Sequence, residues 1–285
     1  MDYHFKFGVE RMCKVFKISR SGFYNWKKRK PSVRQIENQQ VTIEIKKVYK
    51  ASKSRYGSPK ITEQLKDNGW QVSRPRVARI MRNEGIRSIV SKKYRGFTTD
   101  SKHNFPVAKN HLNREFSANR PGQKWVSDIT YIPTKQGWLY LTIVMDLYDR
   151  KIIGWALSTN MTTDDTVLAA WKMAIINRPI TQRLIFHSDR GVQYASHTIK
   201  KELEKYPVTQ SMSRKGNCWD NAVAENYFKI LKSELVNHTQ FHSILQAKTD
   251  LFEFIEIWYN RIRKHSYIGY KTPEQYGKIN YLKSA

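Results

Sequence analysis

The order of strand-like and helix-like segments after Gly122 is the feature that most restricts what this chain can fold into. Three short runs with the residue pattern of strands come first, separated by tight turns: 124–132, 138–146 and 151–156. Helical and strand patterns then alternate along the chain: 162–177, 183–187, 197–205, 208–212 and 219–236. The order βββαβαβα predicts an α/β domain with a mixed five-stranded sheet and flanking helices.

Small all-helical modules are expected before this domain. In residues 1–30, apolar residues recur at helical spacing in two runs that a short polar break separates. This pattern is typical of a helix-turn-helix-like segment, and Ser19 or Ser21 is the candidate N-cap of its second helix.

Residues 31–90 are predicted to form a second helical domain, with helices over about 35–50, 59–68 and 73–83. Ser73 is the candidate N-cap of the third helix, which carries four arginines: Arg74, Arg76, Arg79 and Arg82. Residues three apart adjoin on a helix, so several of these guanidinium groups share a face. We expect this helix to bind DNA in the major groove, with a solvated cationic face as the alternative.

The charge of the whole chain points to a polyanionic partner. Lysine and arginine number 51 against 24 acidic residues, which gives a net charge of +27. Residues 1–120 contain 29 basic and 9 acidic residues, a net of +20, whereas residues 121–285 contain 22 and 15, a net of +7. The N-terminal part is therefore the main electrostatic contact, and double-stranded DNA is the expected partner.

Residues 91–120 show no sustained period and are predicted to be a basic linker. Its cationic cluster of Lys92, Lys93 and Arg95 is expected to contact DNA.

Cysteine content and hydropathy bear on location. Cys13 and Cys218 have no nearby cysteine partner, which argues against a zinc finger and against a disulfide framework. No window approaches the roughly 20 apolar residues of a membrane span, and the N-terminus lacks the apolar core of a signal peptide. We expect a cytoplasmic, nucleoid-associated protein, with an anionic membrane surface as the weaker alternative partner.

Three acidic residues stand out because of the segments that contain them. Asp128 lies inside the apolar strand 125–132, where a carboxylate is costly unless a counter-charge or metal is present. Asp189 closes a predicted strand, at the kind of strand end where α/β sheets bind ligands. Glu225 lies early in a helix beside an apolar face, so its side chain is expected to look inward.

Carboxylates on separate elements suit Mg²⁺, which prefers hard oxygen ligands. Two such ions, about 4 Å apart, activate the attacking oxygen and stabilise the leaving oxygen in phosphoryl transfer. The ordinary alternatives are an ion pair for Asp128, a turn cap for Asp189 and a surface position for Glu225. The combination of the three favours a metal site.

The segments around these residues closely resemble the DDE transposases of bacterial insertion sequences, a group related to retroviral integrases. The similar segments are Trp125-Val-Ser-Asp-Ile-Thr-Tyr, His187-Ser-Asp-Arg-Gly-Val-Gln-Tyr and Asp220-Asn-Ala-Val-Ala-Glu-Asn-Tyr-Phe-Lys-Ile-Leu-Lys. Since 225 − 189 = 36, there are 35 residues between Asp189 and Glu225, the spacing of this group's signature. Residues 15–26, 55–61 and 259–273 also resemble the family, so the likeness covers nearly the whole chain.

The resemblance implies a ribonuclease H-like integrase catalytic core in residues 121–236 and a C-terminal helical segment in residues 237–285. It also implies that Asp128, Asp189 and Glu225 bind two Mg²⁺ ions, with Mn²⁺ as the alternative metal. Lys232, two helical turns after Glu225, matches a basic residue that the family uses near the DNA end, although a lone lysine on a helix is usually just solvated.

Further residues in the matching motifs are expected to support the site: His187, Arg190, Gln193, Asn217, Trp219 and Asn221. Tyr194 and Trp219 are candidates for stacking on bases, and core packing is an equal alternative for both.

The sequence therefore predicts a transposase that cuts a DNA strand at an insertion-sequence end and joins the freed 3′-OH to a second phosphodiester. The resemblance implies a homo-oligomer on DNA, because two element ends must be brought together. It also implies a second-reading-frame product, of the kind joined by frameshifting to a first product with a helix-turn-helix and a leucine zipper. The alternatives are a catalytically silent DNA-binding regulator and a structure-specific ribonuclease H-like nuclease that cuts without joining.

Overall fold

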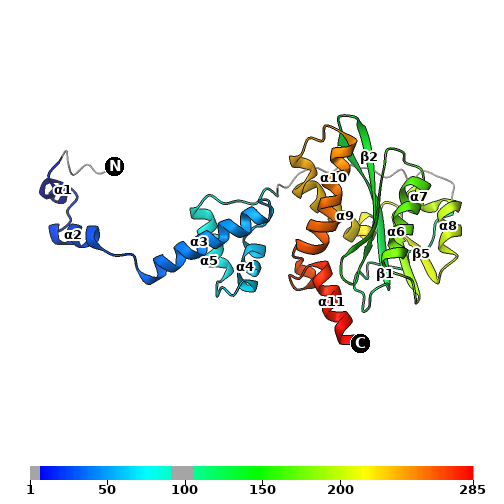
Figure 1. Ribbon diagram of the computed structural model, residues 1–285, viewed down its shortest axis with the longest axis horizontal. Helices are drawn as coiled ribbons and strands as arrows, with labels where there is room; N and C mark the ends of the chain where they lie inside the picture. Colours follow the sequence, from blue (N-terminus) through cyan, green and yellow to red (C-terminus); the bar gives the residue numbers. More distant parts are fainter. Residues whose placement is uncertain (1–6, 91–105, 285) are drawn as a thin grey trace. The chain divides into compact units, whose positions relative to one another are not determined.

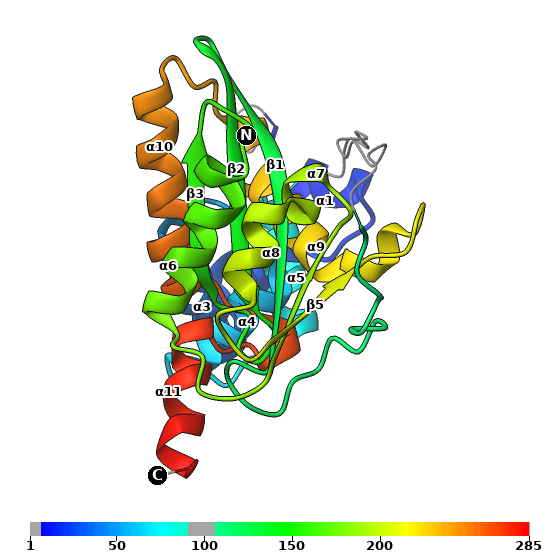
Figure 2. The ribbon, with the colours of Figure 1, turned by 90° about the vertical axis from the view of Figure 1, so that its right-hand side faces the viewer.

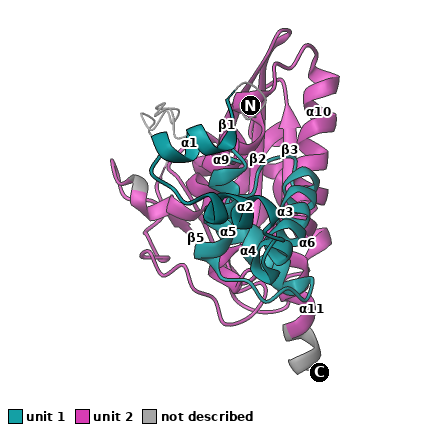
Figure 3. Cartoon of the chain, turned by 90° about the vertical axis from the view of Figure 1, so that its left-hand side faces the viewer, with its two compact units in different colours: residues 1–87 teal, residues 88–285 magenta. Residues whose placement is uncertain are grey.

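A computed structural model describes residues 7–90 and 106–284 of the chain. These residues belong to two compact units, Met1–Arg87 and Ser88–Ala285 (Figure 3). The first unit is helical, and the second is built on a β-sheet. Within the described ranges no helix is both long enough and apolar enough to cross a membrane.

The first unit begins with two short helices, α1 (Val9–Val15) and α2 (Arg20–Lys28). Ser19 is the N-cap of α2, because its hydroxyl accepts a hydrogen bond from the backbone N–H of Gly22 at 3.0 Å. The two helices expected in this segment are confirmed, and Ser19 rather than Ser21 provides the cap.

Three helices complete the first unit: α3 (Val33–Ala51), α4 (Ser58–Asp67) and α5 (Arg74–Asn83). Apolar residues from all three are buried: Val41, Ile45, Val48, Ile61, Leu65, Val77, Ile80 and Met81. As expected, Ser73 caps α5, and its hydroxyl accepts a hydrogen bond from the backbone N–H of Arg76. The apolar stripes that predicted these helices are therefore the surfaces that hold them together.

The second unit contains a mixed five-stranded sheet of β1 (Lys124–Thr134), β2 (Gly137–Asp146), β3 (Ile152–Ser158), β4 (Leu184–Ser188) and β5 (Val208–Met212). The strand order is β3-β2-β1-β4-β5. Strand β2 is antiparallel to β1 and β3, whereas β4 is parallel to β1 and β5. The predicted sheet is confirmed, and β1 lies at its centre, where antiparallel pairing changes to parallel pairing.

Helices cover both faces of this sheet (Figure 1). One face carries the π-helical turn η2 (Asp164–Leu168), which continues into α6 (Ala169–Asn177), and then α7 (Val192–Ala195) and α8 (His197–Leu203). The other face carries the 3₁₀ turn η3 (Cys218–Asn221) and α9 (Ala222–Glu234). The expected order of strands and helices is thus present in full.

Aromatic residues form the core between the sheet and α6. The ring of Trp171 lies 5.6 Å from that of Trp125 on β1 and 5.0 Å from that of Phe186 on β4, measured between centroids. Gly154 lets α6 approach β3 closely, since a Cβ at this position would lie 2.8 Å from the Cβ of Ala174. Trp125 therefore fixes β1, the strand of Asp128, from the face opposite α9.

The C-terminal segment runs through η4 (Val236–His238), α10 (Ile244–Phe252), the π-helical η5 (Glu253–Ile262), η6 (Ser266–Ile268) and α11 (Pro273–Ser284). Helix α10 runs beside β3 (Figure 2). The C-terminal segment expected to be helical over 237–285 contains these helices. Arg263 and Trp258 donate hydrogen bonds to the buried carboxylate of Glu234 at 2.9 and 2.8 Å, which joins this segment to the end of α9.

The part of the expected linker that the structure describes, residues 106–120, packs against the sheet unit. Leu112 is buried, and the backbone N–H groups of His111 and Leu112 donate to the hydroxyl of Ser211 on β5 at 2.8 and 3.1 Å. These contacts depend on single side chains rather than on a repeating pattern, so the sequence showed no sign of them.

Candidate active site

Asp128 is the central acidic residue of the site, because it lies on the middle strand β1. Its side chain is half-buried, and one carboxylate oxygen accepts a hydrogen bond from the backbone N–H of Ile129 at 2.9 Å. This bond restricts the carboxylate, so its position is fixed by the strand itself.

Asp189 immediately follows β4, the strand next to β1. Its Oδ1 accepts a hydrogen bond from the backbone N–H of Gly191 at 2.9 Å. A Cβ at residue 191 would lie only 3.1 Å from the same oxygen, so the glycine gives this carboxylate room to turn back onto the chain. The turn after β4 therefore holds Asp189 at the strand end, as expected.

Glu225 lies in the first turn of α9, and its side chain is 34% exposed. Its Oε2 lies 3.9 Å from the Nζ of Lys229, one helical turn later, whose side chain is 76% exposed. An ion pair this exposed is weak, so it leaves the carboxylate able to accept another cation.

The three carboxylates affect one another's pKa values. Burial raises the pKa of Asp128 well above its ordinary value, and the negative charges of Asp189 and Glu225 raise it further. Burial also raises the pKa of Glu225, as does Asp189, whereas Lys229 lowers it. The charges of Asp128 on β1, of Asp189 after β4 and of Glu225 on α9 therefore act on one another, although the three residues come from separate elements.

Lys232 lies on α9, two helical turns after Glu225. Burial lowers the pKa of its amine, and the charge of Asp128 acts in the opposite direction. The amine therefore lies within electrostatic reach of Asp128, and it is half-buried rather than freely solvated.

The three carboxylates supply the hard oxygen ligands that Mg²⁺ prefers. Burial raises the pKa of Asp128 most, and repulsion from the other two carboxylates adds to it; a bound cation would relieve this repulsion. In the described ranges, however, no group of three or more His, Cys, Asp or Glu side chains stands close enough to form a ligand cluster. The carboxylate oxygens of these three residues are chemically suited to a divalent metal. In this structure, however, the three side chains are not close enough together to coordinate one ion.

His187 lies on β4, two residues before Asp189. Its imidazole is buried and lies 2.8 Å from the hydroxyl of Ser211 and 3.2 Å from that of Ser213. Burial lowers its pKa to about 4, so the ring is neutral at physiological pH and serves as a hydrogen-bonding spacer between β4 and β5. Arg190 extends this link, since its Nε donates to the backbone carbonyl of Ser213 at 2.6 Å.

The loop between β5 and α9 is fixed by the buried carboxylate of Asp220. Arg214 donates to it through Nε at 2.9 Å, through Nη2 at 2.8 Å and through its backbone N–H at 3.0 Å. Arg114 and Asn110 donate to the same carboxylate at 2.8 and 2.9 Å, and Arg114 also donates to Asn217 at 2.7 Å. Arg214 first, and then Arg114, hold the pKa of Asp220 well below its ordinary value.

Sequence reasoning missed this clamp, because Asp220 had been noted only as the start of a motif and Arg114 had been assigned to a linker. The signal that could have found it is the buried acid directly before a helix, which needs a cationic partner.

Asn221 and Tyr194 connect the site to β1 at Ser127, the residue before Asp128. The side-chain amide of Asn221 donates to the backbone carbonyl of Ser127, and the hydroxyls of Tyr194 and Ser127 lie 2.7 Å apart. Tyr194 is fully buried, so core packing is the correct interpretation for it. Trp219 is the opposite case, with 68% of its surface exposed.

The residues expected to bind DNA fall into three groups. Arg74, Arg79 and Arg82 are exposed on α5. Arg76 is half-buried instead, and it donates to the side chains of Glu37 and Asn38 on α3, at 2.9 Å in each case. Lys92, Lys93 and Arg95 lie outside the described residues. The structure therefore gives Arg76 a role in holding α5 against α3.

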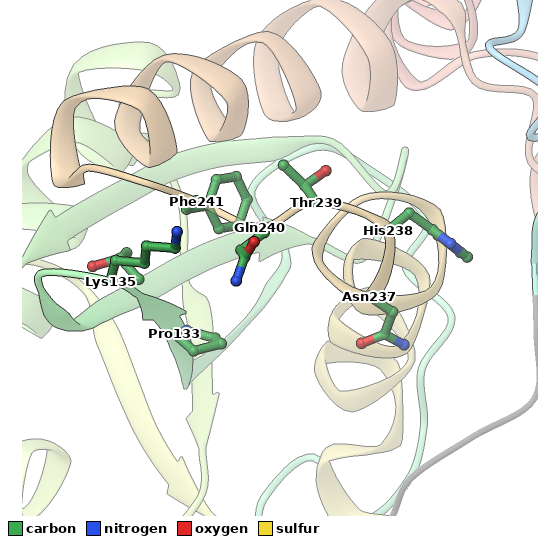
Figure 4. A pocket seen from close by; sticks show the side chains of 8 residues that line it. Pro133, Lys135, Asn237, His238, Thr239, Gln240 and Phe241 are labelled. Carbon is green, nitrogen blue, oxygen red and sulfur yellow. The ribbon is translucent and has the colours of Figure 1, made fainter.

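Two other features lie apart from the three carboxylates. A hollow of about 520 Å³ opens at the far end of β1 and is lined in part by Pro133, Lys135 and Phe241 (Figure 4). Asp146 forms a buried ion pair of 2.6 Å with Arg178, so this acid has a structural role.

Models of known protein families match most of the chain. Two models described as Integrase core domain match residues 118–218 and 206–273, and one described as HTH-like domain matches residues 35–94. Among solved structures, the HTLV-2 integrase catalytic core domain in complex with magnesium is similar with a TM-score of 0.41 and 17% identity, over 56% of this chain and 98% of that one.

Similar curated proteins extend over nearly the full length. The "Insertion element IS600 uncharacterized 31 kDa protein" of Shigella sonnei is 40% identical over 92% of this chain and 96% of its own. The "Transposase InsF for insertion sequence IS3A" of Escherichia coli (strain K12) is 38% identical over 96% of both chains. At this identity and coverage, the chain belongs to the IS3 family of insertion-sequence transposases.

Proposed function

We propose that Asp128, Asp189 and Glu225 are the catalytic carboxylates of this transposase, which cuts and rejoins DNA strands at the ends of an insertion sequence. The observation that carries the proposal is the electrostatic coupling of the three acids. The charges of Asp189 and Glu225 both raise the pKa of Asp128, although the three residues come from different elements. Perturbed acids that converge in this way are typical of catalytic sites.

The three carboxylates would hold a divalent metal, with two Mg²⁺ ions, or Mn²⁺ in their place, as the specific proposal. When bound, such ions favour ionisation of the attacking oxygen and stabilise the leaving oxygen of the phosphodiester. A polynucleotidyl transferase of this kind needs no covalent protein–DNA intermediate, so no serine or tyrosine nucleophile is proposed.

The protein's own contribution is to hold the carboxylates in place before DNA arrives. The N–H of Ile129 restrains Asp128, and the N–H of Gly191 restrains Asp189. Lys232 would contact a phosphate of the reacting DNA end, because its amine lies within electrostatic reach of Asp128. Preorganised groups of this kind lower the barrier because they need not rearrange during the reaction.

The HTH-like and integrase core domains imply that the protein binds DNA. Exposed Arg74, Arg79 and Arg82 on α5 would contact double-stranded DNA, together with the basic cluster of Lys92, Lys93 and Arg95. We further propose a homo-oligomer on DNA that joins two element ends in the cytoplasm. A frameshift fusion to a first-frame helix-turn-helix and leucine-zipper protein belongs to the same proposal.

The test uses labelled element-end DNA and Mg²⁺, scored for nicked and for joined products. Asp128→Asn, Asp189→Asn and Glu225→Gln are each expected to lower both products by at least about 100-fold. Glu204→Gln, at an exposed position after α8, is the matched control and should retain full activity.

Retention of normal strand transfer by the three variants would overturn the catalytic assignment. Nicked products without joined ones in the unaltered protein would indicate a structure-specific nuclease. Tight binding to element ends with no cleavage in any divalent metal would indicate a silent regulator.

A further inference from the structure

Trp219 is a large apolar side chain in an unusual setting. It lies in η3, the turn between β5 and α9, and 68% of its surface is exposed. Scattered apolar residues on a protein surface need no explanation by themselves. What distinguishes Trp219 is how its neighbours in the chain are held.

The residues on both sides of Trp219 are anchored in the second unit. Asp220, the next residue, is buried and accepts hydrogen bonds from Arg214, Arg114 and Asn110. Asn217, two residues earlier, accepts a hydrogen bond from Arg114 at 2.7 Å. These hydrogen bonds fix the backbone on both sides of the exposed indole. Little conformational entropy would therefore be lost when the indole binds a ligand.

The anchors also place Trp219 beside the proposed active site. Asn221, two residues later, donates a hydrogen bond at 3.1 Å to the carbonyl of Ser127, which directly precedes Asp128. Helix α9 begins at Ala222 and carries Glu225 in its first turn. The turn that presents the indole is thus joined to the elements of two of the three carboxylates.

The charged residues of the loop that carries Trp219 indicate which ligand the indole suits. Arg214 and Arg114 keep 50% and 44% of their side chains exposed, and Lys215 is also exposed. Arg214 and Arg114 bond Asp220, the residue next to Trp219, so these cations and the exposed ring belong to one loop. Such a combination fits a nucleic-acid strand, since phosphates pair with the cations and a base can stack on the ring. The bases of an intact duplex offer no free ring face except at the terminal pair, so the ligand must be a base at a DNA end or one that has left its pair.

We propose that Trp219 stacks on a base at the end of the DNA held in the active site and so positions the scissile phosphate near the three carboxylates. The inference rests on the proposed function for its location. The stacking itself requires only that the DNA end binds there.

A fluorescence experiment tests the stacking directly. Element-end duplexes carry 2-aminopurine at the terminal pair or at one of the next two pairs, and they are bound to the full-length protein in Ca²⁺ without cleavage. We expect the 2-aminopurine emission to change at one of these positions with the unaltered protein, to change less with Trp219→Phe and not to change with Trp219→Ala. Trp138→Ala is the matched control, because Trp138 on β2 is also exposed, at 57%.

Kinetics provide the second readout. Loss of one base–aromatic stack is expected to weaken binding of the DNA end, and to raise KM for cleavage in Mg²⁺, by roughly 5- to 150-fold in Trp219→Ala. Trp219→Phe should recover most of this loss, and Trp138→Ala should show none. Thermal unfolding should stay unchanged in Trp219→Ala, because an exposed indole contributes little to the core.

The proposal is overturned if Trp219→Ala keeps both the fluorescence change and the KM of the unaltered protein. It is also overturned if Trp219→Ala weakens self-association in the absence of DNA, because the indole would then contact a second copy of the chain. Failure of the catalytic assignment would look different. In that case Glu225→Gln would still cleave, and the fluorescence change would still depend on Trp219.

Discussion

The side-chain amide of Asn221 donates a hydrogen bond to the backbone carbonyl of Ser127, 3.1 Å away. Ser127 precedes Asp128 on β1, and Asn221 directly precedes the helix that carries Glu225. This buried hydrogen bond therefore links β1, which carries Asp128, to the start of α9, which carries Glu225. Both residues are at most 3% exposed, so water does not compete for this bond.

Asn221→Ala is expected to destabilise the protein by about 1–3 kcal/mol, because it leaves the buried carbonyl of Ser127 without this donor. Cleavage of element-end DNA should fall about 10- to 100-fold, since a small displacement of α9 separates the carboxylates. Urea unfolding and single-turnover cleavage measure the two effects. Asn237→Ala, in the exposed turn after α9, is the control, and equal loss of activity in both variants would contradict this role of Asn221.

Acid stability should depend on Asp220. Its arginine partners hold its pKa below the ordinary value, so the folded state binds a proton less readily than the unfolded state does. The carboxylate therefore contributes stability above about pH 4, and this contribution disappears as the pH falls further, toward the lower pKa of the folded state. Asp220→Asn should cost roughly 1.5–3 kcal/mol at pH 7 and should lose less stability on acidification than the unaltered protein.

Chemical denaturation at pH 7, 5, 4 and 3 checks this expectation. Because Arg214 and Arg114 are about half exposed, solvent screens part of the interaction, and the low end of the range is expected. Parallel pH profiles for Asp220→Asn and the unaltered protein would show that the carboxylate contributes nothing to the acid dependence.

Arg263 and Arg261 allow a test of how burial changes the contribution of an ion pair to stability. Arg263 is 9% exposed and bonds the carboxylate of Glu234, whereas Arg261 is 63% exposed and lies 3.5 Å from Glu274. Arg263→Ala leaves a buried charge without its main partner and should cost about 3–5 kcal/mol. Arg261→Ala should cost less than about 1 kcal/mol. Thermal and urea unfolding measure the difference, and similar losses in the two variants would refute the assignment of Arg263 as a structural clamp.

Substitutions of two arginines of α5 should distinguish a role in stability from a role in DNA binding. Arg79→Ala removes an exposed cation, so it should weaken DNA binding and reduce the salt dependence of the affinity by about one phosphate contact. Arg76→Ala removes the ion pair with Glu37 and should mainly lower the stability of the helical unit. Fluorescence anisotropy at several salt concentrations, together with unfolding of each variant, tells these apart. A larger loss of salt dependence in Arg76→Ala would reverse the two roles.

Periodicity and spacing were sufficient to predict the elements. The strand over 208–212 was predicted with the bounds that β5 has, and Ser73 was recognised as the N-cap of α5. Both signals are local, since side-chain alternation and capping depend on residues a few positions apart. The bounds of α11 were not predicted, because its few apolar positions show no strong face of their own.

The sequence by itself determined which residues belong to the candidate site: Asp128, Asp189 and Glu225 were chosen from their segments and from the 35 residues between the last two. Only the tertiary structure decided how these acids interact, that Arg114 and Asn110 clamp the loop before α9, and that Trp219 is exposed while Tyr194 is buried. The physical reason is distance along the chain. Asn110 and Arg114 meet Asp220 across more than a hundred residues, and burial depends on every element that packs nearby, so no local pattern encodes either outcome.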